Sequence, residues 1–160
     1  MSDRISRFIG VMKNPVKSRL FLFFKLPAAF FAGVRLREID QRSCVVSVPY
    51  QWLSQNPFKS TYFACLSMAA EMSTGALAMA HVQGAGEKIS MLVLKVESEY
   101  FKKAISRCYF TCEDGDMFSA AIEKTLASGE AALVRARSTG RNQAGELIAE
   151  FHITWSLKKK

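Results

Sequence analysis

Apolar residues dominate every face of the stretch 62–80, which holds good helix formers, no proline and a single charged residue, Glu71. This pattern predicts one long helix. Ser60 or Thr61 would cap its start and residues 84–86 would end it. A helix that is apolar on nearly every side belongs in a domain interior, because a surface helix would show a charged face. We therefore expect the rest of the chain to wrap around this helix.

Shorter patterns predict the other elements. Apolar residues at helical spacing predict a helix near the N-terminus, and a second one follows Pro15 and ends or kinks at Pro27. Alternating and β-branched runs predict strands, and a capped apolar run predicts one more helix. The strands are at residues 34–39, 44–50, 89–103, 106–112, 130–137 and 147–157, the helix is at 117–127, and 139–145 forms a turn. The run 89–96 is apolar on both faces, which predicts a central strand.

The predicted order groups strands around a long helix instead of alternating strands with helices. Such an order favours an α+β fold, in which an antiparallel sheet of about six strands wraps around the helix as in the hotdog arrangement. No repeat or low-complexity tract interrupts the chain. We expect an N-terminal helical extension at residues 1–33 and a single hotdog domain at residues 34–160.

The long helix carries one narrow polar stripe. At about 100° per residue the stripe contains Ser60, Ser67, Glu71, Thr74 and His81. An acid among methionines and alanines is costly to bury unless it is hydrogen-bonded or has a function. One interpretation of Glu71 is a satisfied core carboxylate, or one at a solvent window or subunit contact. The other is a general base or nucleophile beside a pocket whose apolar walls set its pKa.

The composition is that of an ordinary globular domain, with 160 residues of which 49% are hydrophobic and 22% charged. The four cysteines show no C-x-x-C and no clustering with the two histidines, so we expect reduced thiols, no metal site and a cytoplasmic protein. His81 lies about 15 Å from Glu71 along the helix, too far for a catalytic pair. His152 falls in the polar register of the last strand, which predicts a surface position.

The net charge of +8 favours anionic partners such as coenzyme phosphates, nucleic acid or an acidic membrane, beside the commoner case of a solvated basic surface. The basic residues are scattered and no nucleic-acid reader motif is present, so we expect no nucleic-acid partner. Residues 20–34 are too interrupted to span a bilayer. Five phenylalanines near Lys17, Arg19 and Lys25 in that region are compatible with a peripheral membrane contact through the N-terminal helices.

Three segments resemble one family when taken in order. The first runs from Asn56 before the long helix to Glu71 two turns into it. The second is the aromatic and basic strand end at 99–104, and the third is the glycine-led last strand at 145–151. Together they resemble the hotdog-fold thioesterase superfamily, in particular acyl-CoA thioesterases of the phenylacetic-acid pathway and a bacterial branch with extra N-terminal helices. The resemblance covers residues 34–157.

The resemblance implies a thioester hydrolase acting on acyl-CoA or acyl-carrier-linked substrates, with no cofactor besides the coenzyme A of the substrate. Glu71 would attack the thioester or activate a water, and Asn56 would position the water or the substrate. Backbone N–H groups at the helix start would polarise the thioester carbonyl, which suits the positive end of the helix dipole. The residues concerned are Thr61, Tyr62, Phe63 and Ala64.

Other positions receive supporting roles. Ser67 and Thr74, one turn on either side of Glu71, could hydrogen-bond the carboxylate or line a tight helix contact. Candidates for holding a coenzyme A phosphate are Lys102, Lys103, Arg135 and Arg137. The resemblance also implies a homodimer or a dimer of dimers with sites at the subunit boundary. Ser60, Phe63 and Ala64 replace glycines of the family, which keeps open the alternative of a non-catalytic protein that binds acyl chains or lipids.

Overall fold

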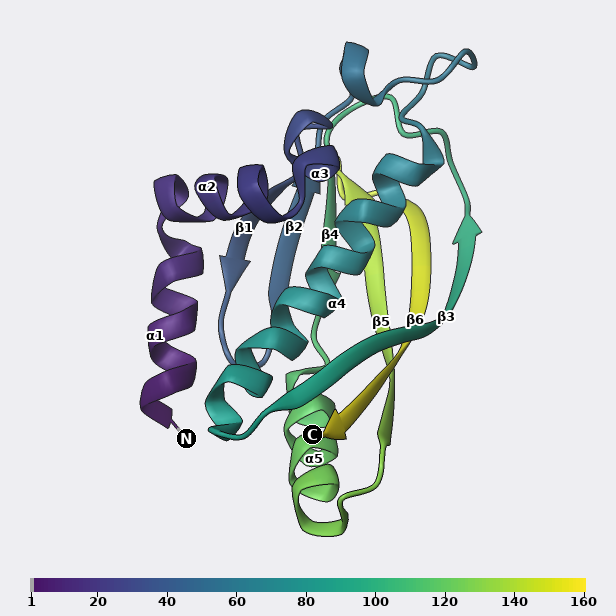
Figure 1. Ribbon diagram of the computed structural model, residues 1–160. Coiled ribbons are helices and arrows are strands. Elements are labelled where there is room, and N and C mark those ends of the chain that lie inside the picture. Colours follow the sequence, from purple (N-terminus) through teal and green to yellow (C-terminus); the bar gives the residue numbers. More distant parts are fainter. Residues whose placement is uncertain (1) are drawn as a thin grey trace.

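The computed structural model describes residues 2–160 and has a six-stranded antiparallel sheet with a long helix lying across one face (Figure 1). The helices are α1 (Ser2–Lys13), α2 (Pro15–Lys25), α3 (Pro27–Phe31), the 3₁₀ turn η1 (Trp52–Ser54), α4 (Phe63–Ala85) and α5 (Gly115–Ser128). The strands are β1 (Arg35–Ile39), β2 (Cys44–Val48), β3 (Ile89–Tyr100), β4 (Cys108–Cys112), β5 (Ala132–Asn142) and β6 (Leu147–Lys159). The α+β prediction and the central position of the long helix are confirmed.

The sheet has the strand order β1-β2-β4-β5-β6-β3, and all neighbours are antiparallel. Its inner face packs on α4, because alternate side chains of each strand point toward that helix. Val46 on β2, Ala136 on β5 and Phe151 on β6 are fully buried there. These inward positions agree with the alternation in the sequence.

Nearly every face of α4 is covered, as its composition predicts. It is also the one helix within residues 2–160 long and apolar enough to cross a membrane, but most of it is buried among the other elements, as expected of a core helix. Gly86 ends it in the left-handed conformation at φ 77°. The predicted cap at Ser60 or Thr61 is wrong, because the N-cap is Tyr62 and those two hydroxyls bond to Asn56 and Ala104 instead.

The prediction that residues 89–96 form a central strand is wrong, because β3 lies at the edge of the sheet. Leu92 faces outward opposite Ser156, Leu94 lies at a bulge, and Val96 faces inward opposite Ile153, yet all three are solvent-exposed. The apolar residues on both faces of this run therefore belong to an edge strand, and part of their surface is left uncovered. The turn predicted at 139–145 is also too long, since β5 continues to Asn142, whose side chain accepts the N–H groups of Ala144 and Glu146.

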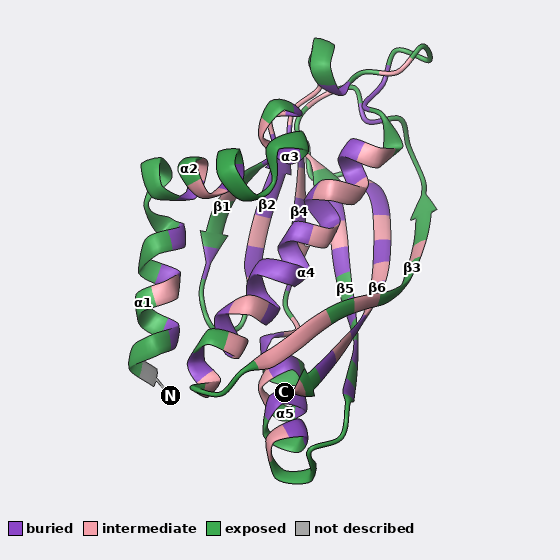
Figure 2. Cartoon of the chain, in the orientation of Figure 1, coloured by how far each residue is buried: buried purple, intermediate pink, exposed green. Residues whose placement is uncertain are grey.

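The three N-terminal helices pack against α4 and the β1 side of the sheet (Figure 2). Ile5, Ile9 and Met12 form the buried side of α1. Ile5 sits directly on Gly84 of α4, where an added Cβ would lie only 2.1 Å from Ile5 Cγ1. Asn14 caps α2 by accepting the N–H groups of its first turn. The predicted end or kink at Pro27 is confirmed, because α2 ends at Lys25 and Pro27 begins α3.

Candidate functional site

A cavity of about 450 Å³ lies between the N-terminal helices and the middle of α4. We call it the chamber. Its apolar walls come from α1, α2, β1, α4, β3 and β6 and include Phe8, Met12, Phe21, Leu36, Met72, Met79, Met91 and Trp155. Only two charged residues line it, Glu71 from α4 and Lys25 from the end of α2. The chamber therefore offers one acid and one base in an otherwise hydrocarbon surface.

Glu71 is half-buried, and its removal from water raises the pKa of its carboxyl. Within residues 2–160 its carboxylate has neither a hydrogen-bond donor nor an ion-pair partner. Gly75, one turn further along α4, gives it space, because a Cβ there would lie 3.1 Å from Glu71 Oε1 and 3.1 Å from Trp155 Cζ2. The carboxylate and the indole thus share the gap that this glycine leaves.

The two hydroxyls beside Glu71 on the polar stripe are engaged elsewhere. Thr74 Oγ1 accepts the indole N–H of Trp155 at 3.0 Å and donates to the backbone oxygen of Glu71 at 3.0 Å. Ser67 Oγ donates to the backbone oxygen of Phe63 at 3.0 Å. Thr74 therefore fixes the indole at the chamber wall, and neither hydroxyl bonds to the Glu71 carboxylate.

A second, more open pocket of about 670 Å³ lies at the start of α4, and we call it the helix-start pocket. It contains Asn56, Lys102 and Lys103 but not Glu71. The carboxamide of Asn56 holds its own loop, because Oδ1 accepts the N–H of Phe58 at 3.0 Å and both the N–H and the hydroxyl of Ser60. Asn56 and Glu71 therefore line different pockets of the same protomer.

Four backbone N–H groups at the helix start are proposed as donors to the thioester carbonyl, and two of them already have acceptors. The N–H of Thr61 donates to the Ala104 oxygen at 2.8 Å, and that of Tyr62 donates to the Ser54 oxygen at 2.7 Å. Those of Phe63 and Ala64 find no acceptor among residues 2–160, as is usual for the first turn of a helix. Phe63 begins α4 eight residues before Glu71, which is about 12 Å along the axis. A carbonyl group cannot contact both in one protomer.

The four candidate phosphate-binding residues lie in two separate places, two at the helix-start pocket and two on the outer face of the sheet. Lys102 is paired with Glu146, and Lys103 Nζ reaches the Phe58 oxygen at 3.4 Å; both line the helix-start pocket. Arg135 is paired with Glu97 at 3.1 Å on the other face of the sheet. Arg137 follows the inward-facing, buried Ala136 on β5, so it points to the same outer face as Arg135. There it lines a polar groove.

The cysteine thiols and the histidine imidazoles lie in surroundings that suit a role in the fold. Burial raises the pKa of the Cys108 thiol to about 11 and of the Cys112 thiol to about 12, so neither is a nucleophile near neutral pH. His81 Nε2 lies 2.8 Å from the Gln41 carbonyl oxygen and joins α4 to the turn between β1 and β2. His152 is partly buried, 3.7 Å from Glu150.

Several residues of the chamber carry no functional signal in the sequence. Trp155 falls within the predicted last strand with no further signal, and Gly75 falls within the segment around Glu71. Phe8 and Met12 fit the buried face of an amphipathic helix, and periodicity does not say which element that face covers. Lys25 could be suspected only as the one charge inside an apolar run.

Comparisons with known proteins agree with this fold. The family model described as "Domain of unknown function (DUF4442)" matches residues 17–157, and no curated protein matches the sequence. Among solved structures, a Pseudomonas aeruginosa protein of unknown function, described as a probable thioesterase, is similar with a TM-score of 0.78 and 17% identity, covering 91% of this chain and 97% of that one.

Two further structures are of proteins named as thioesterases. The Haemophilus influenzae enzyme has a TM-score of 0.64 and 12% identity, covering 88% of each chain. A Staphylococcus aureus enzyme, solved with a glutamine replaced by alanine, has a TM-score of 0.61 and 15% identity, covering 79% of this chain and 94% of that one. At these identities the likeness shows the shared hotdog fold.

Proposed function

The chain belongs to the family described as "Domain of unknown function (DUF4442)", and from that premise we propose that it is a thioester hydrolase acting on acyl-CoA or acyl-carrier-linked substrates. The observation that carries the proposal is the unpartnered Glu71 carboxylate on the wall of an apolar chamber. A half-buried acid among apolar side chains and without a hydrogen-bond donor lowers the stability of the fold, and a role in chemistry or ligand binding would account for its presence.

The chamber suits the acyl part of such a substrate. Its apolar walls would hold a hydrocarbon chain, and its volume of about 450 Å³ lies within the range of small-molecule sites. Lys25 would meet an anionic part of the substrate near the chamber. The thioester carbonyl would then lie near Glu71, with the chain directed toward Phe8 and Met12 of α1.

Glu71 can act in two ways. As a general base it takes a proton from water while the water oxygen bonds to the carbonyl carbon; the C–S bond then breaks and the proton passes to the departing sulfur. As a nucleophile its oxygen forms an anhydride with the acyl group, the thiol leaves, and water hydrolyses the anhydride. The raised pKa suits the first route, because a stronger base accepts the proton more readily.

We infer that the hydrolase is a dimer. The free N–H groups of Phe63 and Ala64 would serve as an oxyanion hole, but they lie too far from the Glu71 of their own chain. Antiparallel pairing of β3 with a second β3 would satisfy the unpaired backbone N–H and C=O groups at this free edge of the sheet. The end of one β3, beside the helix-start pocket, would then approach the start of the other, where Met91 lines the chamber.

One comparison supports the roles of Asn56 and Glu71. The Staphylococcus aureus thioesterase was solved once with a glutamine and once with a glutamate replaced by alanine, and those two positions are fifteen residues apart. Asn56 and Glu71 have the same separation. We propose that Asn56 shapes the loop that presents the helix start, while Glu71 carries out the proton transfer or attack.

A panel of acyl-CoA and acyl-carrier thioesters, followed by release of free thiol, tests the proposal. We expect hydrolysis by the wild type and none by Glu71→Ala, with both variants purified identically. Turnover that survives in Glu71→Ala, or that is missing for every chain length, would count against it.

A second candidate is a non-catalytic binder of acyl chains, favoured by the non-glycine residues at the helix start, where Phe63 is exposed. Native mass spectrometry of the purified protein separates the two, since a retained lipid without hydrolysis indicates the binder.

A further inference from the structure

The outer side of α2 is apolar although it faces solvent. Val16, Leu20, Phe23 and Phe24 follow one another at helical spacing, so they share one side of the helix. Phe24 is 72% and Val16 66% exposed, whereas Ser18 and Leu22 on the opposite side are buried. A surface helix normally turns its polar side outward. Something other than water is therefore expected to contact this side.

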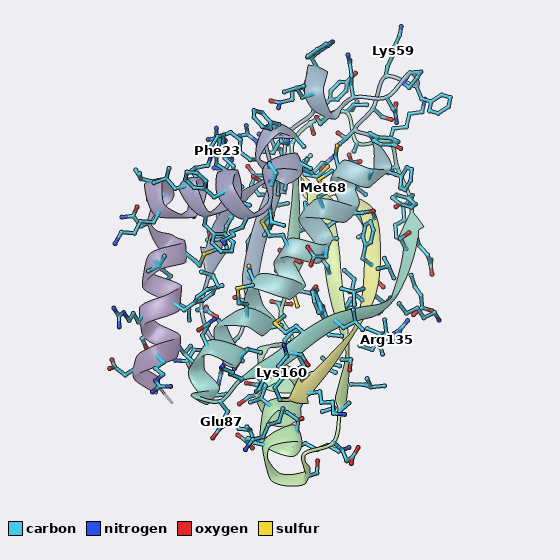
Figure 3. The ribbon with its side chains drawn as sticks, viewed as in Figure 1. Phe23, Lys59, Met68, Glu87, Arg135 and Lys160 are labelled. Carbon is cyan, nitrogen blue, oxygen red and sulfur yellow. The ribbon has the colours of Figure 1, made fainter. Side chains whose placement is uncertain are left out.

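The apolar surface continues onto α3. Phe31 is exposed, and its ring packs edge-on against Phe30 at 5.3 Å and Phe23 at 6.4 Å. We call the five exposed residues the outer patch; they are Val16, Leu20, Phe23, Phe24 and Phe31. Phe23 lies where α2 meets α3, at the opposite end of the view from Glu87 and Lys160 (Figure 3). Trp52 of η1, in the segment between β2 and α4, is 80% exposed.

The charges around the outer patch are all positive in this part of the chain. No acidic residue occurs between Asp3 and Glu38. Lys17 and Lys25 border the patch on α2, and within residues 2–160 neither forms an ion pair. Arg19 lies over the Phe30 ring at 3.8 Å. Two acids from other parts of the chain lie near this region: Asp40, which interacts with Lys13 at the corner between α1 and α2, and Glu71, which lines two pockets together with Lys25.

We propose that the outer patch docks onto the surface of an anionic lipid bilayer. Aromatic and aliphatic side chains enter the boundary between headgroups and acyl chains, and flanking lysines attract anionic lipids. A second copy of this chain is a poorer occupant, because its identical positive charges would face these ones without acids to pair them. The free edge of β3 lies on a different side of the molecule (Figure 1), so dimer formation there would leave the patch open.

Docking would also bring the chamber to the lipid. Lys25 and Leu26, which line the chamber, stand at the end of α2 beside Phe24. The same two residues line a smaller pocket with Glu71 and Pro27 on the α3 side. The chamber wall would therefore face the headgroup layer. The docking itself does not depend on whether Glu71 catalyses hydrolysis.

Co-sedimentation of the full chain with vesicles tests the proposal. We expect binding to phosphatidylcholine vesicles containing about 30% phosphatidylglycerol, and much weaker binding to phosphatidylcholine alone. Phe24→Ala with Phe31→Ala should lower the partition coefficient by about tenfold or more, since both rings leave the interface. Lys17→Glu should lower it about tenfold, and raised salt should weaken wild-type binding.

Matched controls lie at the other end of the molecule. Leu133→Ala removes an equally exposed apolar side chain from β5, and Lys124→Glu reverses an exposed charge on α5; both should bind vesicles like the wild type. Equal binding to neutral vesicles, or unchanged binding of the double phenylalanine variant, would overturn the proposal. So would a fall in oligomer mass of that variant in sedimentation velocity, which would make the patch a contact between copies.

Discussion

At the start of α4 the polar groups bond to one another, whereas in the middle of the same helix a carboxylate lies against hydrocarbon. The side-chain oxygen of Asn56 accepts the N–H groups of Phe58 and Ser60, and the N–H groups of Thr61 and Tyr62 donate to backbone oxygens. Glu71 has no such partner within the described chain. The difference separates a region whose polar side chains hold the fold together from one whose carboxylate has no partner in the described chain.

The largest effect should come from the middle of the helix. Glu71→Gln keeps the size of the side chain but removes its ability to take a proton or attack a carbonyl. We expect kcat on the best acyl-CoA to fall about 1,000-fold, with circular dichroism unchanged. Steady-state thiol release measures the loss. A variant within a few-fold of wild type would place Glu71 among residues that serve only the fold.

Substitution of Asn56 should lower the stability of the fold. Asn56→Ala removes the acceptor that holds the loop, so the free energy of unfolding should fall by about 1–2 kcal/mol. Asn56→Asp keeps an acceptor for the N–H groups of Phe58 and Ser60 and should recover most of that loss. Denaturant titration of the three proteins provides the measurement. Equal stability of the alanine variant and the wild type would show that the loop does not need this side chain.

Gly75 tests how closely the carboxylate is placed. Its substitution by alanine puts a methyl group 3.1 Å from both Glu71 Oε1 and the Trp155 ring, so one of them must move. We expect kcat/KM to fall about tenfold, because a small displacement of a catalytic group is costly. Ala78→Gly, at another position of α4, is the control for helix propensity. Full activity of Gly75→Ala would mean that the position of Glu71 is not critical.

The smallest expected effect is on the pH dependence of the free energy of unfolding. Burial raises the pKa of Glu71 above its ordinary value of 4.5, so the folded chain holds this proton more tightly than the unfolded chain. The free energy of unfolding contributed by Glu71 therefore decreases as pH rises from that value through the raised pKa. We expect Glu71→Gln to melt at a higher temperature than wild type at neutral pH, and the gap to close below pH 4.5. A wild type that is the more stable protein at neutral pH would contradict this sign.

Much of the fold could be predicted because the burial of one face of a strand or helix spaces apolar residues regularly along the sequence. The alternation around Ala136 and Phe151 indicates which side of each strand is inward, and the composition of α4 indicates a helix enclosed on most sides. Periodicity does not identify the covering element, so the edge position of β3 was missed. An apolar row has the same pattern whether a strand, a helix or a second subunit covers it.

The site was less predictable for a related reason. Glu71 could be singled out because a lone charge in an apolar helix is unusual. The chamber beside it depends on residues from opposite ends of the chain, such as Phe8 and Trp155, which meet only after α1 has folded onto α4. The separation between Asn56 and Glu71 into two pockets follows from the loop hydrogen bonds, which sequence spacing does not reveal.

The contact between Ile5 and Gly84 gives a position remote from Glu71 control over the size of the chamber. A methyl group at Gly84 would have to displace Ile5. Because α1 is a single helix, Phe8 and Met12 would move outward together with Ile5. The chamber would widen without any change in the residues that line it, and bulkier acyl groups would gain room. Under the proposed function, the range of acyl groups accepted would then depend on a residue outside the chamber.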